Sequence, residues 1–137
     1  MTIRFLKHAL MTLAVALGAL LYTPDASAID DPTLDYYTIE TPHFYVHYYT
    51  GMRDFAWRVA RVHEEAHAAL APLLDWVPRV KTHVVITDRT DTANGSANVY
   101  GRNIIRIFSM PPEPEGVLGY YDDWLRILAY HEYVHTL

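Results

Sequence analysis

Residues 122–137 read DDWLRILAYHEYVHTL and contain the pattern H-E-x-x-H at His131, Glu132 and His135. In a helix, successive residues are about 100° apart, so His135 lies only about 40° around the axis from His131. Two imidazoles one turn apart can bind a single Zn²⁺, and a glutamate beside them can act as a general base. The stretch therefore predicts a helix that carries a metal site.

The residues before the motif also favour a helix. Asp122 or Asp123 can act as the N-cap, because a carboxylate there accepts hydrogen bonds from free backbone N–H groups. Apolar residues occupy much of the circumference: Trp124, Leu125, Ile127, Leu128 and Val134. We therefore expect a buried helix, in which histidine and glutamate must be paired or bound to a metal.

A second match to the pattern lies at His63, Glu64 and His67. It falls on a long predicted helix that begins near Gly51 and carries an apolar stripe on one face. We predict that His63 and His67 lie on a solvated flank of this helix. Structural metal binding at this motif is the alternative, and it predicts that His63→Ala removes the metal and His131→Ala does not.

Two strands are predicted before the long helix, at residues 36–40 and 43–49, where aromatic and β-branched residues alternate. In the second strand one face would be buried, and the other face would carry His43 and His47. We interpret these two histidines as half-exposed sheet residues, because metal binding has no support beyond their residue type.

Further strands follow the long helix, which we expect to end within residues 72–78, between two prolines. Residues 81–87 predict a buried strand, and residues 97–100 and 104–108 predict a hairpin. Residues 103–109 are the expected edge strand, on which an extended peptide could pair main chain to main chain. An ordinary covered strand is the alternative for this segment.

The loop at residues 88–95 is dense in turn-forming residues. Asp88 and Asp91 either cap turns with their carboxylates or bind calcium or substrate, and we favour turn capping.

The N-terminal 28 residues have the three parts of a secretory signal. Arg4 and Lys7 are positive, residues 9–21 form an apolar run, and residues 26–28 are a small-residue cleavage site ending at Ala28. We predict export to the periplasm or the medium, with cleavage after Ala28 and no integral membrane span afterwards. A mobile leader at 29–35 and one domain at 36–137 would remain.

Composition narrows the functional classes. The chain has 16 acidic and 11 basic residues, a net charge of −5, which argues against nucleic acid as a partner. It has no cysteine, so disulfides and cysteine-ligated metals are excluded. Ser96 and Ser109 lack the sequence context of a nucleophilic serine, so a serine hydrolase is unsupported.

The order of strand, long helix, strand, hairpin and motif helix resembles the N-terminal half of a gluzincin metallopeptidase domain. Three patterns look like those of bacterial exported peptidase-like proteins that carry this domain before a WD40-like β-propeller. They are T-x-H-F-x-V-H-Y at 41–48, D-x-x-D-x-x-N-G at 88–95 and D-D-W-L-R-x-L-x-x-H-E-Y at 122–133. The resemblance covers residues 36–137 and implies an α+β fold, in which a twisted mixed sheet packs on the long first helix and on the H-E-x-x-H helix.

The resemblance implies that His131 and His135 bind Zn²⁺ and that Glu132 is the general base for peptide-bond hydrolysis by a metal-activated water. Peptides or proteins would be the substrates, and no substrate-binding residues are predicted. A gluzincin takes its third ligand, a glutamate, from the following helix, which this chain lacks. We therefore expect an N-terminal fragment of a zincin domain, incomplete at its C-terminus and inactive alone. The alternative is a non-catalytic envelope interaction module that keeps the zincin fold and docks a C-terminal β-propeller.

Overall fold

The computed structural model describes residues 33–116, 119 and 123–137. The predicted signal segment at 1–28 and the leader up to residue 32 lie outside the described residues. Within the described part of the chain, no helix is long and apolar enough to cross a membrane. Leu34–Leu137 form one unit, and the elements below all belong to it.

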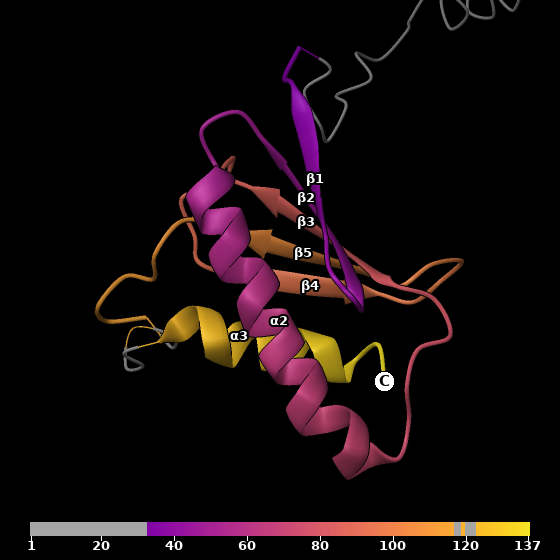
Figure 1. Cartoon of the computed structure of the whole chain (residues 1–137). Coiled ribbons are helices and arrows are strands. Elements are labelled where there is room, and N and C mark those ends of the chain that lie inside the picture. The colour runs from indigo at the N-terminus through magenta and orange to yellow at the C-terminus, as the bar shows by residue number, and fades with distance from the viewer. Residues whose placement is uncertain (1–32, 117–118, 120–122) are drawn as a thin grey trace, which may run out of the picture. The chain divides into compact units, whose positions relative to one another are not determined.

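A five-stranded mixed sheet is the centre of the fold, which confirms the α+β class (Figure 1). Its strands are β1 (Tyr36–Glu40), β2 (Phe44–Tyr49), β3 (Thr82–Thr87), β4 (Gly95–Asn98) and β5 (Ile104–Phe108). Their order in the sheet is β1-β2-β3-β5-β4. The three inner strands are parallel, and each edge strand pairs antiparallel with its neighbour.

Two helices, α2 (Arg53–Leu74) and α3 (Trp124–Val134), pack on one face of this sheet (Figure 1). Helix α2 contacts β1 and β2, α3 contacts β4 and β5, and the two helices contact each other. Strand residues at period two supply the sheet side of the core, so their alternate side chains are buried. These residues are Phe44, Val46, Val84, Ile86, Ile105 and Ile107.

The end of α2 confirms the prediction. The helix ends at Leu74, within residues 72–78, and Pro72 lies in its last turn. Asp75 follows in the left-handed conformation, with φ 51°, and its backbone N–H bonds to the carbonyl of Ala71. The left-handed residue therefore ends the helix, in the way that a C-terminal capping motif does.

The predicted edge strand was wrong. Strand β5, which fills most of residues 103–109, lies between β3 and β4, so both of its sides are paired. The edge beside it is β4, which begins at Gly95 and not at residue 97. Strand order depends on which distant segments pair, and alternation within one segment does not report it.

Gly95 lies where β4 meets α3. A Cβ atom at this position would be 2.9 Å from the carbonyl oxygen of Arg106, 3.1 Å from Cγ of Glu132 and 3.3 Å from Cδ1 of Leu128. The first of these neighbours is backbone and cannot move away cheaply. A side chain at position 95 would therefore push β4 away from α3 or from β5.

We predict that Gly95→Val lowers the free energy of unfolding by about 1–3 kcal/mol, the usual cost of overpacking. Ser96→Val is the matched control, because residue 96 is the exposed neighbour on the same strand and should change stability by less than about 0.5 kcal/mol. Urea denaturation of both variants measures the difference. Equal midpoints would show that α3 does not need the close approach to β4.

Candidate metal centre

The H-E-x-x-H pattern lies at the C-terminal end of α3, as the sequence predicts. His131 and Glu132 are in the last turns, and His135 is the first residue beyond the helix. Its backbone angles, φ −65° and ψ −16°, continue the helical path. The imidazole centroids of His131 and His135 are therefore only 5.1 Å apart, with their ring planes at 79°. The structure brings the two predicted ligands together.

The start of α3 is held to α2 by charged side chains. Asp123 is the N-cap, and its carboxylate accepts a hydrogen bond from the backbone N–H of Arg126 at 3.3 Å. Arg58 of α2 donates to the same carboxylate at 2.9 Å, and Arg126 donates to Glu65 of α2 at 2.7 Å. Exposed ion pairs stabilise little, so these bonds mainly align the two helices. The other predicted cap, Asp122, lies outside the described residues.

The prediction that α3 is buried was wrong for one side of the helix. Both motif histidines are exposed, and so are Ile127 and Val134. The described part of the chain covers only the side of α3 that faces the sheet and α2. The two imidazoles therefore lie on the uncovered side.

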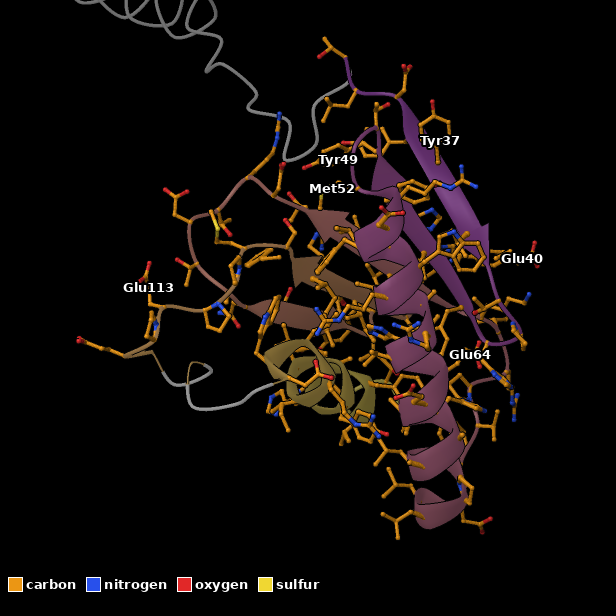
Figure 2. All side chains as sticks on the ribbon, turned by 60° about the vertical axis from the view of Figure 1, so that its left-hand side comes forward. Tyr37, Glu40, Tyr49, Met52, Glu64 and Glu113 are labelled. Carbon is orange, nitrogen blue, oxygen red and sulfur yellow. The ribbon has the colours of Figure 1, made fainter. Side chains whose placement is uncertain are left out.

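Glu132 lies in a cleft between α3 and two loops. The cleft has a volume of about 620 Å³, and Glu132 and His131 form part of its wall. Residues 91–94 line it from the loop before β4, and Pro112, Glu113 and Gly116 line it from the loop after β5. Figure 2 labels Glu113 on that second loop. The predicted general base and one predicted ligand thus line the same open space.

The Glu132 carboxylate opens to the cleft and has no partner among the described residues. Its residue is only 6% exposed, and no described residue donates a hydrogen bond to it. The imidazoles of His131 and His135 likewise have no hydrogen bond to any described residue. The three polar groups of this motif are therefore free to bind a ligand.

These donors fit part of a zinc site. Zn²⁺ binds neutral imidazoles and carboxylates, and catalytic sites use three protein ligands. Among the described residues, no group of three or more His, Asp or Glu side chains is arranged to hold a metal ion. The described chain thus supplies two imidazole ligands and an adjacent carboxylate, which is the donor set that the sequence predicts.

Asp88 and Asp91 have different surroundings. The carboxylate of Asp88 accepts a hydrogen bond from the hydroxyl of Tyr49, and its backbone N–H donates to that hydroxyl at 3.0 Å. Burial and the bond to Asp88 raise the pKa of Tyr49 to about 12. Asp88 therefore ties the end of β3 to β2, whereas Asp91 lines the cleft.

The prediction that His63 and His67 lie on a solvated flank was wrong. His63 is fully buried, and Nδ1–H donates to the carbonyl of Val59 at 2.9 Å. His67 is 9% exposed, and its Nδ1 is 2.6 Å from the hydroxyl of Tyr133 in α3. Burial lowers the pKa of both histidines, to about 4 for His63. The contact between α2 and α3 covers this flank, and periodicity within α2 cannot report that contact.

His43 and His47 also differ from each other. His47 is half-buried on the sheet face without helices, as expected, and its Nε2 is 2.8 Å from Nδ1 of His83. His43 lies against α2 instead. Its Nδ1–H donates to the Glu64 carboxylate at 2.7 Å, and its ring stacks on that of His67. His43 precedes β2, so it does not follow the alternation of the strand.

Comparison with known proteins identifies no relative. No family model, no curated protein and no solved structure matches this chain. A functional assignment therefore depends on the geometry of the motif and its cleft.

We predict that His63 makes the protein sensitive to acid. Its pKa is about 4 in the folded chain against 6.5 as the ordinary value, so the unfolded chain binds more protons between these pH values. Stability from this group is therefore present above pH 6.5 and is lost as the pH falls towards 4, by about 2 kcal/mol at pH 5.

His63→Leu removes this titration and should flatten the dependence of unfolding free energy on pH between 7 and 5. His131→Leu, at an exposed position, is the control and should keep the dependence. Urea denaturation at the two pH values measures both. The same acid sensitivity in His63→Leu and the parent chain would contradict the prediction.

Proposed function

We propose that this chain is a zinc-dependent metallopeptidase domain, the function that its resemblance to gluzincins implies. One observation carries the proposal: the Glu132 carboxylate has no hydrogen-bond partner among the described residues and forms part of the wall of a cleft. A carboxylate that opens to a cleft without a protein partner is free to take a proton from a bound water. The free imidazoles of His131 and His135 beside it supply the ligands.

Each residue of the motif has a role in the proposed reaction. His131 and His135 hold the metal through imidazole nitrogens. Zn²⁺, when bound, polarises the scissile carbonyl and activates water. The Glu132 carboxylate accepts a proton from the attacking water and returns it to the leaving amine.

The edge strand gives the proposed substrate a binding direction. The outer side of β4 has no partner strand among the described residues, and β4 contacts the motif helix. An extended peptide could therefore pair with Gly95–Asn98 and enter the cleft at residues 91–94. This assignment replaces residues 103–109, which form an inner strand. The contacts of α3 with β4 and with α2 support the proposed zincin-like arrangement.

The cellular location and the substrate class in this proposal rest on the sequence. The proposal includes export, cleavage after Ala28 and action on peptides or proteins in the periplasm or the medium. Nucleic acid is not an expected partner, because the chain is acidic.

An interaction module without catalysis is the second candidate. It is favoured by exposed large apolar side chains at the end of α2 and after it: Leu73, Leu74, Trp76, Val77 and Val80. Clustered apolar exposure of this kind marks interaction surfaces. Both candidates keep the fold and can keep the metal, so only peptide hydrolysis distinguishes them.

We predict that the full chain binds Zn²⁺ or Co²⁺ through the second motif. His131→Ala and His135→Ala should each weaken binding by at least about tenfold, because each removes a ligand. His47→Ala is the matched control, since this histidine lies on the sheet face without helices and its loss should leave affinity unchanged. Isothermal titration measures these variants and His63→Ala. Loss of metal in His63→Ala with retention in His131→Ala would move the site to the first motif.

We predict that a protein that supplies a third metal ligand beside this chain's motif hydrolyses peptides and that a chelator stops it. Glu132→Gln should lower kcat by about 10²–10⁴, the usual contribution of a general base, with metal still bound. Residues 29–137 alone should be inactive, and chelator-sensitive, Glu132-dependent hydrolysis by them would contradict that expectation. Stoichiometric zinc without cleavage of any peptide in a library would favour the interaction module.

A further inference from the structure

The two H-E-x-x-H motifs are in direct contact. Tyr133 lies inside the second motif, between Glu132 and His135, and is almost fully buried. Its hydroxyl is 2.6 Å from Nδ1 of His67, the last residue of the first motif. A hydrogen bond this short, between buried groups on two helices, fixes the rotation of α3 relative to α2.

His67 is itself held in place from the strand side. The ring of His43 stacks on it, with centroids 3.5 Å apart and planes at 18°. Glu64, also of the first motif, accepts hydrogen bonds from the backbone N–H of His43 at 2.9 Å and from its Nδ1 at 2.7 Å. Glu64 is labelled partway along α2 in Figure 2. The first motif and the residue before β2 thus form a rigid support for Tyr133.

Packing adds to this support. Phe44, the first residue of β2, contacts the ring of His63 edge-on at 5.3 Å and the ring of Tyr133 at 5.2 Å. Phe44 is fully buried, and so is His63. All three positions of the first motif therefore act on Tyr133: His67 directly, His63 through Phe44, and Glu64 through His43 and His67.

The chain after the second motif also closes on Tyr133. Its carbonyl accepts from the backbone N–H of Thr136 at 2.9 Å and from the Thr136 hydroxyl at 2.8 Å. Asn103, before β5, donates to the Thr136 carbonyl at 3.3 Å. His135 lies between Tyr133 and Thr136 in the sequence and outside the regular helix. Its position therefore depends on the hydrogen bonds that hold these two residues.

We propose that the first motif is the structural brace of the second, with His67 acting through Tyr133 as a positioning residue for His131 and His135. The inference rests on the proposed function, since the residues positioned are the proposed ligands. In this proposal both oxygens of Glu64 and the Nδ1 atoms of His63 and His67 bond to the protein, so they serve the structure of the support.

The loss of the brace should loosen the last turn of α3. The final carbonyls of a helix have no partners within it, and α3 has only 11 residues, so its end depends on tertiary contacts. Hydrogen-bond partners that orient metal ligands typically contribute 10–100-fold to metal affinity. A loosened turn would separate the two imidazoles without unfolding the domain.

Four variants of the full chain test the brace. Tyr133→Phe removes only the hydroxyl, and His67→Leu removes the ring nitrogen that it meets. His67→Asn is the conservative variant, because the Asn amide has a polar atom where Nδ1 lies. Tyr130→Phe is the control: this tyrosine is also on α3, but its hydroxyl accepts only from Arg126, at 3.2 Å.

Two measurements are made on each variant. NMR through-space contacts between the His131 and His135 rings are measured in metal-free protein, and Co²⁺ binding is followed by its visible spectrum. Tyr133→Phe and His67→Leu should lose the ring contact, weaken Co²⁺ binding by about 10–100-fold and alter the spectrum. His67→Asn and Tyr130→Phe should keep all three properties.

The outcomes separate this inference from the proposed function. Absence of Co²⁺ binding by the parent chain would count against the metal site. The NMR contact between the His131 and His135 rings in metal-free protein would still test whether the first motif positions the second. Unchanged ring contact in both Tyr133→Phe and His67→Leu would overturn the inference. Should circular dichroism show that His67→Leu is unfolded, Tyr133→Phe decides alone, because it keeps the packed ring.

Discussion

The packing of α3 against α2 is the contact on which the candidate site depends. It buries Tyr133 between Phe44 and His67 and so decides which side of α3 faces the protein. With that side fixed, His131 and His135 have to face outward, and Glu132 has to face the cleft. On the sheet side, Gly95 allows β4 to lie close to α3, because a side chain at this position would contact Glu132 and Leu128 of the helix.

This packing also carries a cost in polar burial. Nε2 of His63 and the hydroxyl of Thr82 are buried without a hydrogen bond among the described residues. Each such group costs about 1–3 kcal/mol, which the apolar core has to offset. Glu132 differs from them because it lines the cleft, where its carboxylate can bind a ligand.

The sequence was sufficient for features that arise within one segment. The helix of the second motif, its cap at Asp123 and the buried strand β3 follow from local patterns of apolar and capping residues. The motif itself also predicts the closeness of His131 and His135, since helix geometry sets it. These features depend on neighbours within about four positions, so no knowledge of the tertiary structure is needed.

Features that depend on distant segments were predicted wrongly. The edge strand was predicted wrongly because β5 pairs with β3 on one side and with β4 on the other. The alternation of residues within a strand does not indicate which strands pair with it. The burial of His63 and His67 was missed because α3, more than 50 positions later, covers that flank of α2. His43 was misassigned because its partner, Glu64, is 21 positions away.

The comparison of the two motifs shows what the pattern H-E-x-x-H can and cannot specify. Helix geometry places the three side chains in one sector in both cases. Tertiary packing then decides whether that sector faces protein or open space. In the first motif both oxygens of Glu64 and Nδ1 of His67 bond to protein groups, and His63 is enclosed by the core. In the second motif the imidazoles and the carboxylate have no partner among the described residues. The availability of donor atoms, rather than the spacing of the residues, therefore identifies the candidate site.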